Sequence, residues 1–195
     1  MDEDSIEFVY KDRNYKLNVS GEYNVLNAIA AIEVGVACGL GYEEIACGLR
    51  EYTPIEKRGS RIELKNGALL INDCYNANPD SMKASLSTFL STYNNRKKVL
   101  VLGDMGELGE HEEFYHREAG RLIRNYDVDY LVVIGELSKF ISEEAGVKNT
   151  KCFSAGDIDN VVSFLKNIVD KDSVVLFKAS RVMKLEEIIK KLVEE

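Results

Sequence analysis

The sequence lacks any uninterrupted apolar run close to the ~20 residues that cross a bilayer, so no membrane insertion is expected. It also lacks net basic charge, because 33 acidic residues outweigh 25 Lys and Arg and leave a formal charge of −8. Broad nucleic-acid and anionic membrane surfaces both require a basic footprint, so neither partner is expected. Residues 1–5 are acidic where a secretory signal is basic, which predicts a cytoplasmic protein.

Cysteine and histidine are scarce and poorly spaced for metal binding. The four cysteines are Cys38, Cys47, Cys74 and Cys152. They form no Cys-x-x-Cys pair, which predicts reduced, mostly buried thiols and no disulfide framework. His111 and His116 are five residues apart, whereas the helical zinc motif needs a spacing of four. We therefore expect no metal ligands among the protein side chains.

The pattern of residues 1–54 indicates an incomplete domain. Alternating apolar and polar residues over 6–19 predict a β-hairpin. From about residue 24 to 39 the chain is apolar nearly all round, which predicts a helix buried on both faces, and an amphipathic helix follows over 42–52. Because a hairpin and a buried helix cannot close a core by themselves, we interpret residues 1–54 as the end of a larger domain.

Residues 55–195 alternate between strands and helices. The predicted strands are 61–64, 68–73, 98–102, 130–134, 151–153 and 174–178. The predicted helices are 79–93, 110–126, 137–144, 158–168 and 183–193. The short apolar runs suit strands covered on both faces, so the pattern predicts a three-layer α/β domain with a mainly parallel sheet. Asn66-Gly67 predicts an antiparallel hairpin between the first two strands.

Polar side chains are dense just after the predicted strand 68–73. Asp73, Tyr75, Asn76 and Asn78 fall within six residues. Ligands of open parallel sheets bind beyond the carboxyl ends of the strands, and an Asp there can accept hydrogen bonds from ribose hydroxyls. Asn78 has a second explanation, because Asn before Pro79 is typical of a helix N-cap.

Two cationic segments are further candidates. Lys178, Ser180 and Arg181 follow the last predicted strand and suit a carboxylate or phosphate clamp, unless Ser180 only caps the next helix and the cations are solvated. Residues 57–61, with Arg61 at their end, form a basic run at the junction of the two segments. This run either meets a ligand between domains or is a solvated surface.

Two other features have weaker chemical signals. The loop 103–109 has glycines spaced G-x-x-G-x-x-G, and its Asp104 and Glu107 would repel a pyrophosphate, which favours a shaped loop over a phosphate cradle. Asn24 and Asn27 lie one turn apart on the apolar helix. Asn24 suits an N-cap, whereas a buried Asn27 requires a partner, and such amides suit the edge of an adenine.

Four runs, in order, resemble one family. Residues 21–31 are similar to a helix of the Mur ligases. Residues 72–82 (NDCYNANPDSM) resemble more specifically the branch that adds D-alanyl-D-alanine, and 101–109 and 178–183 fit the same branch. The resemblance extends from about residue 8 to the end of the chain. It departs at Tyr23, where many relatives have His, and at Ala179, where Gly is usual.

The resemblance implies a domain assignment and an activity. The family has three domains, and this sequence contains no Gly-Lys-Ser or Gly-Lys-Thr of the phosphate loop of the central domain. Residues 1–54 would be the tail of the central ATP-binding domain and 55–195 the C-terminal Rossmann-like domain. The implied reaction uses ATP to join D-Ala-D-Ala to UDP-N-acetylmuramoyl (UDP-MurNAc) tripeptide through an acyl phosphate, in peptidoglycan precursor synthesis. The implied Mg²⁺ would bind chiefly outside this chain, which alone is expected to be inactive.

The resemblance also implies roles for individual residues. Asn24 and Asn27 would contact adenine, Arg61 the γ-phosphate and Asp73 the ribose, and the catalytic set would be Arg61, Asp73 and Tyr75. The substrate-binding set would be Asn76, Asn78, Lys178, Ser180 and Arg181. Alternatives are another Mur ligase, a folylpolyglutamate synthase-like ligase, or a non-catalytic nucleotide-binding or scaffold module.

Overall fold

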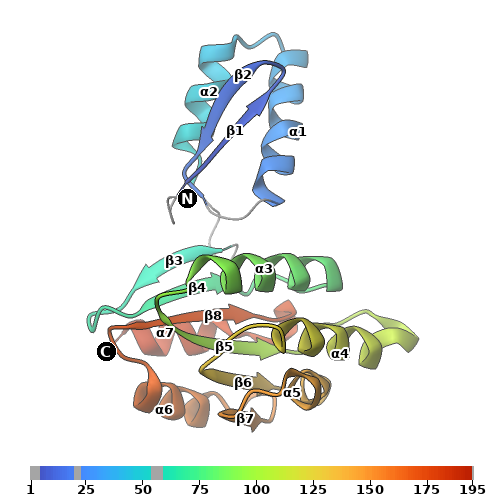
Figure 1. Cartoon of the computed structure of the whole chain (residues 1–195), viewed down its shortest axis with the longest axis vertical. Coiled ribbons are helices and arrows are strands. Elements are labelled where there is room, and N and C mark those ends of the chain that lie inside the picture. Colours follow the sequence, from blue (N-terminus) through green and yellow to red (C-terminus); the bar gives the residue numbers. More distant parts are fainter. Residues whose placement is uncertain (1–4, 20–22, 54–58, 195) are drawn as a thin grey trace. The chain divides into compact units, whose positions relative to one another are not determined.

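The structure, a computed structural model, describes residues 5–19, 23–53 and 59–194 (Figure 1). The chain forms two compact units that divide between Pro54 and Ile55. Among the described residues, no helix is both long enough and apolar enough to cross a membrane.

The described part of the first unit contains a hairpin and two helices. Strands β1 (Ile6–Tyr10) and β2 (Arg13–Leu17) pair antiparallel, and α1 (Tyr23–Ala37) and α2 (Tyr42–Glu51) follow. Both residues of the connecting turn, Lys11 and Asp12, have positive φ, as in the type I′ turns that match the twist of paired strands. The predicted hairpin and both predicted helices are confirmed.

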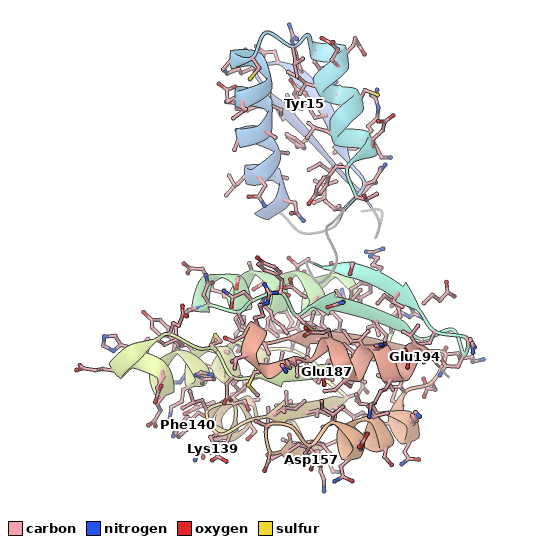
Figure 2. All side chains as sticks on the ribbon, turned by 180° about the vertical axis from the view of Figure 1, so that it is seen from behind. Tyr15, Lys139, Phe140, Asp157, Glu187 and Glu194 are labelled. Carbon is pink, nitrogen blue, oxygen red and sulfur yellow. The ribbon has the colours of Figure 1, made fainter. Side chains whose placement is uncertain are left out.

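Tyr15 is central to the small core of this unit. Its ring stacks on Phe8 with centroids 5.6 Å apart and meets Tyr42 edge-on at 5.5 Å. Figure 2 shows its side chain between the hairpin and the helices. The other buried apolar residues are Leu17, Val19, Ala28, Ile32, Ile45, Ala46 and Leu49.

The prediction that α1 is buried on both faces is wrong. Ala28 and Ile32 face the core, but Leu26, Val34 and Val36 are 71%, 63% and 55% exposed. Apolar composition shows that a helix favours burial, but it does not show what covers each face.

The second unit contains a mixed sheet. Within the described residues its six strands are β3 (Ser60–Glu63), β4 (Leu69–Asp73), β5 (Lys97–Gly103), β6 (Tyr130–Ile134), β7 (Thr150–Phe153) and β8 (Ser173–Lys178). Their order is β3-β4-β8-β5-β6-β7 (Figure 1). The β3–β4 pair is antiparallel and the other pairs are parallel, which confirms the predicted sheet and its initial hairpin.

Helices cover both faces of this sheet. One face carries α3 (Pro79–Thr92), α4 (Glu112–Ile123) and α5 (Lys139–Ala145), and the other carries α6 (Ile158–Ile168) and α7 (Glu186–Val193). The predicted three layers are confirmed. Short 3₁₀ turns precede α4 and α7, so these α-helices begin two or three residues later than predicted.

Strand β8 lies between β4 and β5, and every residue in it is buried. Its last residue, Lys178, is in register with Asp73 of β4 and with Leu102 of β5. Because these three strands are parallel, their following loops meet at one edge of the sheet, the edge where ligands of open sheets bind. We call it the carboxyl edge.

The prediction of mostly buried cysteines is wrong. All four thiols are free, but only Cys74 is buried, while Cys38, Cys47 and Cys152 are exposed. Cys152 lies on β7, an edge strand of the sheet, and the other two belong to the first unit, whose core is small.

Candidate functional site at the carboxyl edge

A buried ion pair joins the ends of β4 and β8. The Lys178 ammonium donates to Asp73 Oδ2 at 2.7 Å and to the Asn76 carbonyl oxygen at 3.3 Å. The Lys178 side chain is 2% exposed and that of Asp73 is 17% exposed. The alternative that Lys178 is solvated is therefore wrong.

The pair follows from the place of β8 in the sheet. A lysine at the end of a strand covered on both faces cannot reach water, so its charge requires an acidic partner. Lys178 compensates the charge of Asp73 and holds Oδ2, whereas Oδ1 is not used by this pair. Asp73 can thus offer an acceptor atom without placing an uncompensated negative charge beside an anionic ligand.

The start of α3 is capped as the sequence predicts. The Asn78 side-chain oxygen accepts from the Ser81 amide at 2.8 Å, and Ser81 Oγ accepts from the Asn78 amide at 3.0 Å. Pro79 is the first helical residue, so the predicted cap is confirmed. The side chain of Asn76, two residues earlier, is exposed at the same edge.

Ser180 links three loops. Its hydroxyl accepts from the Gly106 amide at 2.6 Å and donates to the Ala77 carbonyl at 3.5 Å. Its own amide donates to the Asp104 carbonyl at 2.9 Å. Ser180 occupies the N-cap position of the 3₁₀ turn that follows it, but its side chain makes no capping hydrogen bond, so the alternative that its hydroxyl only caps the next helix is wrong.

Tyr75 and Arg181 form the solvent-facing part of this edge. The guanidinium carbon of Arg181 lies 5.6 Å from the centroid of the Tyr75 ring, and both residues are exposed. A cation over an aromatic face is worth ~0.5–1 kcal/mol at an exposed site, which orients both groups without burying them. A forked cationic donor beside an aromatic ring suits a carboxylate.

The loop 103–109 is held by Asp104, whose role the sequence does not reveal. Its carboxylate accepts from the amides of Glu136, Leu137 and Ser138 at 3.2, 3.1 and 2.7 Å. Gly135 leaves room for this carboxylate, which would collide with any Cβ there. An acidic residue directly after an apolar strand, as at Asp73, is the signal that marks it.

His116 supports the same loop from α4. It is fully buried, its Nε2 lies 2.9 Å from the Met105 amide nitrogen, and its Nδ1 lies 2.6 Å from the Glu112 carbonyl oxygen. Its helical spacing to the buried Ala119 and Ile123 is the sequence signal for an inward-facing histidine.

The other predicted residues lie elsewhere. Arg61 is on β3, and its guanidinium carbon lies 5.8 Å from the centroid of the Tyr93 ring, at the opposite end of α3 from Asn78. The basic residues Lys57 and Arg58 lie outside the described residues.

The asparagines of α1 belong to the first unit. Asn27 is exposed, so the prediction that burial forces a partner on its carboxamide is wrong. Asn24 is the second residue of α1, which excludes it as the N-cap. Of the two departures from the family pattern, Ala179 does not have the positive φ that would require glycine, and the Tyr23 side chain lies outside the described residues.

The second unit is therefore a Rossmann-like α/β domain with its candidate site at the carboxyl ends of β4, β8 and β5. A family model described as Mur ligase, glutamate ligase domain, matches residues 57–181. The chain belongs to the Mur ligase family.

Similar proteins point to one branch of the family. The chain is 38% identical to the UDP-N-acetylmuramoyl-tripeptide–D-alanyl-D-alanine ligase of Bacillus subtilis, over 98% of this chain and 43% of that protein. A crystal structure of MurF from Acinetobacter baumannii matches 99% of this chain and 43% of its own, with TM-score 0.84 and 30% identity. MurF from Thermotoga maritima in complex with ADP matches 98% of this chain and 46% of its own, with TM-score 0.79 and 26% identity.

The likeness covers only part of each relative, and more distant structures share only the fold. The chain spans less than half the length of these relatives. Folylpolyglutamate synthase from Thermotoga maritima, at 17% identity and TM-score 0.59, shares the fold alone.

Proposed function

We propose that this chain is the C-terminal part of a cytoplasmic ligase that uses ATP to join D-Ala-D-Ala to UDP-MurNAc-tripeptide in peptidoglycan precursor synthesis. The observation that carries the proposal is the 38% identity, over nearly the whole chain, to a ligase of that name. The carboxyl edge supports it, because runs about 100 residues apart in sequence, 72–82 and 178–183, meet there.

The reaction places three demands on the protein. The γ-phosphoryl group of ATP moves to the terminal carboxylate of the tripeptide, and the resulting acyl phosphate is attacked by the amine of D-Ala-D-Ala, with loss of phosphate. The protein neutralises charge, positions two anionic substrates and excludes water. From the family resemblance we assign Arg61 to the γ-phosphate, a role for which its guanidinium must leave the Tyr93 ring. We assign Asp73 Oδ1 to the ribose, with Lys178 holding Oδ2. Asn24 and Asn27 are assigned to the adenine.

The outer part of the edge suits the incoming dipeptide. We assign Arg181 to its carboxylate and place Tyr75 beside the reacting groups, with Asn76 and Asn78 assigned to substrate binding at the same edge. The single O–H of Ser180 is donated to the Ala77 carbonyl, and the hydroxyl oxygen accepts from the Gly106 amide, so no proton of this side chain is left for the carboxylate of the dipeptide. The contribution of Ser180 to substrate binding is therefore the shape of the turn that carries Arg181.

The first unit is proposed as the end of the central ATP-binding domain. The exposed Leu26, Val34 and Val36 of α1 support this, because several large apolar side chains exposed on one helix favour a covering partner. The described residues hold no group of three or more His, Cys, Asp or Glu suited to a metal ion. As the family resemblance implies, we propose that the ligands of Mg²⁺ lie chiefly outside this chain, and we derive no step through it.

An assay of the full-length protein tests the activity. We expect phosphate release that requires both UDP-MurNAc-tripeptide and D-Ala-D-Ala, and a product whose mass equals their sum less water. L-Ala-L-Ala serves as the matched control and supports little release. Turnover with a different amine, and none with D-Ala-D-Ala, would contradict the proposal.

Variants of the full-length protein test the residue roles. Asp73→Ala and Arg61→Ala are each expected to lower kcat/KM by roughly 10- to 1000-fold, the scale of losing a positioning or charge-stabilising group. Arg61→Lys restores only part of the loss if the contact is a bidentate fork. Lys151→Ala, an exposed cation on β7, is the control. Wild-type kinetics for both alanine variants would refute the roles and leave the activity standing.

A further inference from the structure

Three consecutive residues of the loop 103–109, residues 104–106, form hydrogen bonds with neighbouring elements. The Asp104 carboxylate binds the turn after β6, and its carbonyl accepts from the Ser180 amide. The Met105 amide donates to His116, and the Gly106 amide donates to the Ser180 hydroxyl. These bonds link the loops after β8, β5 and β6 to α4, and two of them, from Asp104 and Gly106, are made with Ser180.

The bonds of His116 define its protonation. A backbone carbonyl only accepts, so Nδ1 carries the proton that it donates to the Glu112 oxygen. A backbone amide only donates, so Nε2 is unprotonated and accepts from Met105. The ring is thus neutral, with its proton on Nδ1, and both of its nitrogens are used inside the protein.

A histidine at this buried position costs free energy that an apolar side chain would not cost. An apolar side chain would pack beside Ala119 and Ile123 without burying two polar nitrogens. What an apolar residue cannot provide is an acceptor for the buried Met105 amide, which orients the peptide just before Gly106. Fully satisfied polar networks of this kind hold one conformation against its competitors.

We propose that His116 and Asp104 are positioning residues of the ligase. Through the backbone of residues 104–106 they set the place of Ser180, and with it the turn that presents Arg181 to the D-Ala-D-Ala substrate. This inference rests on the proposed function, and it assigns to the loop 103–109 the task of shaping the amine site.

Two substitutions at one position separate positioning from packing. In His116→Asn the side-chain amide reaches the place of Nδ1 and leaves Met105 without an acceptor. In His116→Gln the amide oxygen reaches the place of Nε2 and restores that acceptor. In the full-length ligase we expect His116→Asn to raise KM for D-Ala-D-Ala roughly tenfold, the effect of about one hydrogen bond, with KM for ATP little changed. His116→Gln recovers most of this loss.

Controls distinguish this inference from the activity on which it rests. His111→Asn changes an exposed histidine of the same segment and should leave both KM values unchanged. Ser180→Ala breaks the same link from the other side and should reproduce the selective rise in KM for D-Ala-D-Ala, which keeps the test valid if His116→Asn does not fold. Absence of turnover with D-Ala-D-Ala in the wild-type protein refutes the proposed function instead.

A measurement without substrate completes the test. Nitrogen NMR of the 195-residue chain should show His116 protonated at Nδ1 alone, and His116→Asn should speed hydrogen exchange at the amides of Met105 and Gly106. Exchange in the β6 strand should stay unchanged. A proton on Nε2, equal KM values for the two His116 variants, or a parallel rise in KM for ATP and for D-Ala-D-Ala would overturn the inference.

Discussion

At the scale of single residues, burial determines what the charged groups of the carboxyl edge do. Lys178 and Arg181 are three residues apart and both carry a positive charge, yet the first is enclosed beside Asp73 and the second is exposed over Tyr75. A buried ammonium is tied to its partner, because separating the pair leaves an uncompensated charge in a medium that solvates it poorly. An exposed guanidinium can exchange water for a ligand.

We predict that Lys178→Met destabilises the second unit by about 2–3 kcal/mol, below the cost for fully enclosed pairs because Asp73 is partly exposed. The loss is measured by urea denaturation of the chain. The double variant Lys178→Met/Asp73→Asn should recover more than half of it, since no unpaired charge remains. Equal stability of Lys178→Met and wild type would contradict a stabilising role of the ion pair between Lys178 and Asp73.

At the scale of elements, α4 and α5 pack so closely that a glycine is required between them. A Cβ at Gly120 would collide with the Ile141 carbonyl and lie 2.7 Å from Glu144 Cβ. The same helices share an ion-pair network, in which Glu144 meets Arg117, Arg121 and Arg124 at 3.2, 3.5 and 3.6 Å. Close approach of the helices brings these long side chains together.

We therefore expect Gly120→Ala to destabilise the second unit, although helix propensity alone predicts that it would stabilise it. Alanine favours a helix by about 1 kcal/mol, but overpacking against a backbone carbonyl costs more, and we expect a net loss of about 2 kcal/mol. Gly48→Ala in α2 is the matched control, because a Cβ there meets nothing within 4 Å, and it should stabilise the first unit by about 0.5–1 kcal/mol. Hydrogen exchange of the backbone amides measures the stability of each unit separately. If Gly120→Ala stabilised the second unit, the close packing of α4 against α5 would be contradicted.

A second prediction for the elements concerns pH. The Lys97 ammonium, 2.9 Å away on β5, together with the Ser173 hydroxyl, lowers the pKa of Asp170 in the turn before β8. A carboxyl with a lowered pKa stabilises the folded state above its unfolded pKa of about 3.9 and loses that contribution as the pH falls toward the folded value. The Tm difference between wild type and Asp170→Asn should shrink from about pH 6 to about pH 3. A constant difference would contradict this.

At the scale of the whole molecule, the residues that the proposed function assigns to ATP form only part of a nucleotide site, since the sequence contains no Gly-Lys-Ser or Gly-Lys-Thr of a phosphate loop. Phosphate-loop amides and Mg²⁺ supply most of the charge compensation in phosphoryl transfer, and one arginine cannot replace them. We predict that the 195-residue chain neither hydrolyses ATP nor ligates, and that it binds ATP no more tightly than ~1 mM. Calorimetric titration with ATP and Mg²⁺ and a phosphate-release assay with both substrates test this. Micromolar affinity would contradict it.

Much of the fold is predictable because it depends on local patterns. Alternation of strands and helices, the Asn66-Gly67 turn and the Asn78 cap each depend on a few consecutive residues, and the structure confirms all three. The candidate loops were also predictable, since polar residues after apolar strands mark the edge of a parallel sheet.

Which loops touch, and how, depends on the order of the strands. Asp73 and Lys178 meet only because β8 enters the sheet between β4 and β5, a pairing of segments about 100 residues apart that no local period encodes. The same pairing buries Lys178. It also places Ser180 within hydrogen-bond distance of the Gly106 amide, in the loop 103–109 whose Met105 amide donates to His116. The sequence by itself determined which polar and charged residues follow the strands at this edge. Only the tertiary structure decided which of them are exposed to solvent and which are buried and hold the others in place, because burial is a property of neighbours that are distant in the chain.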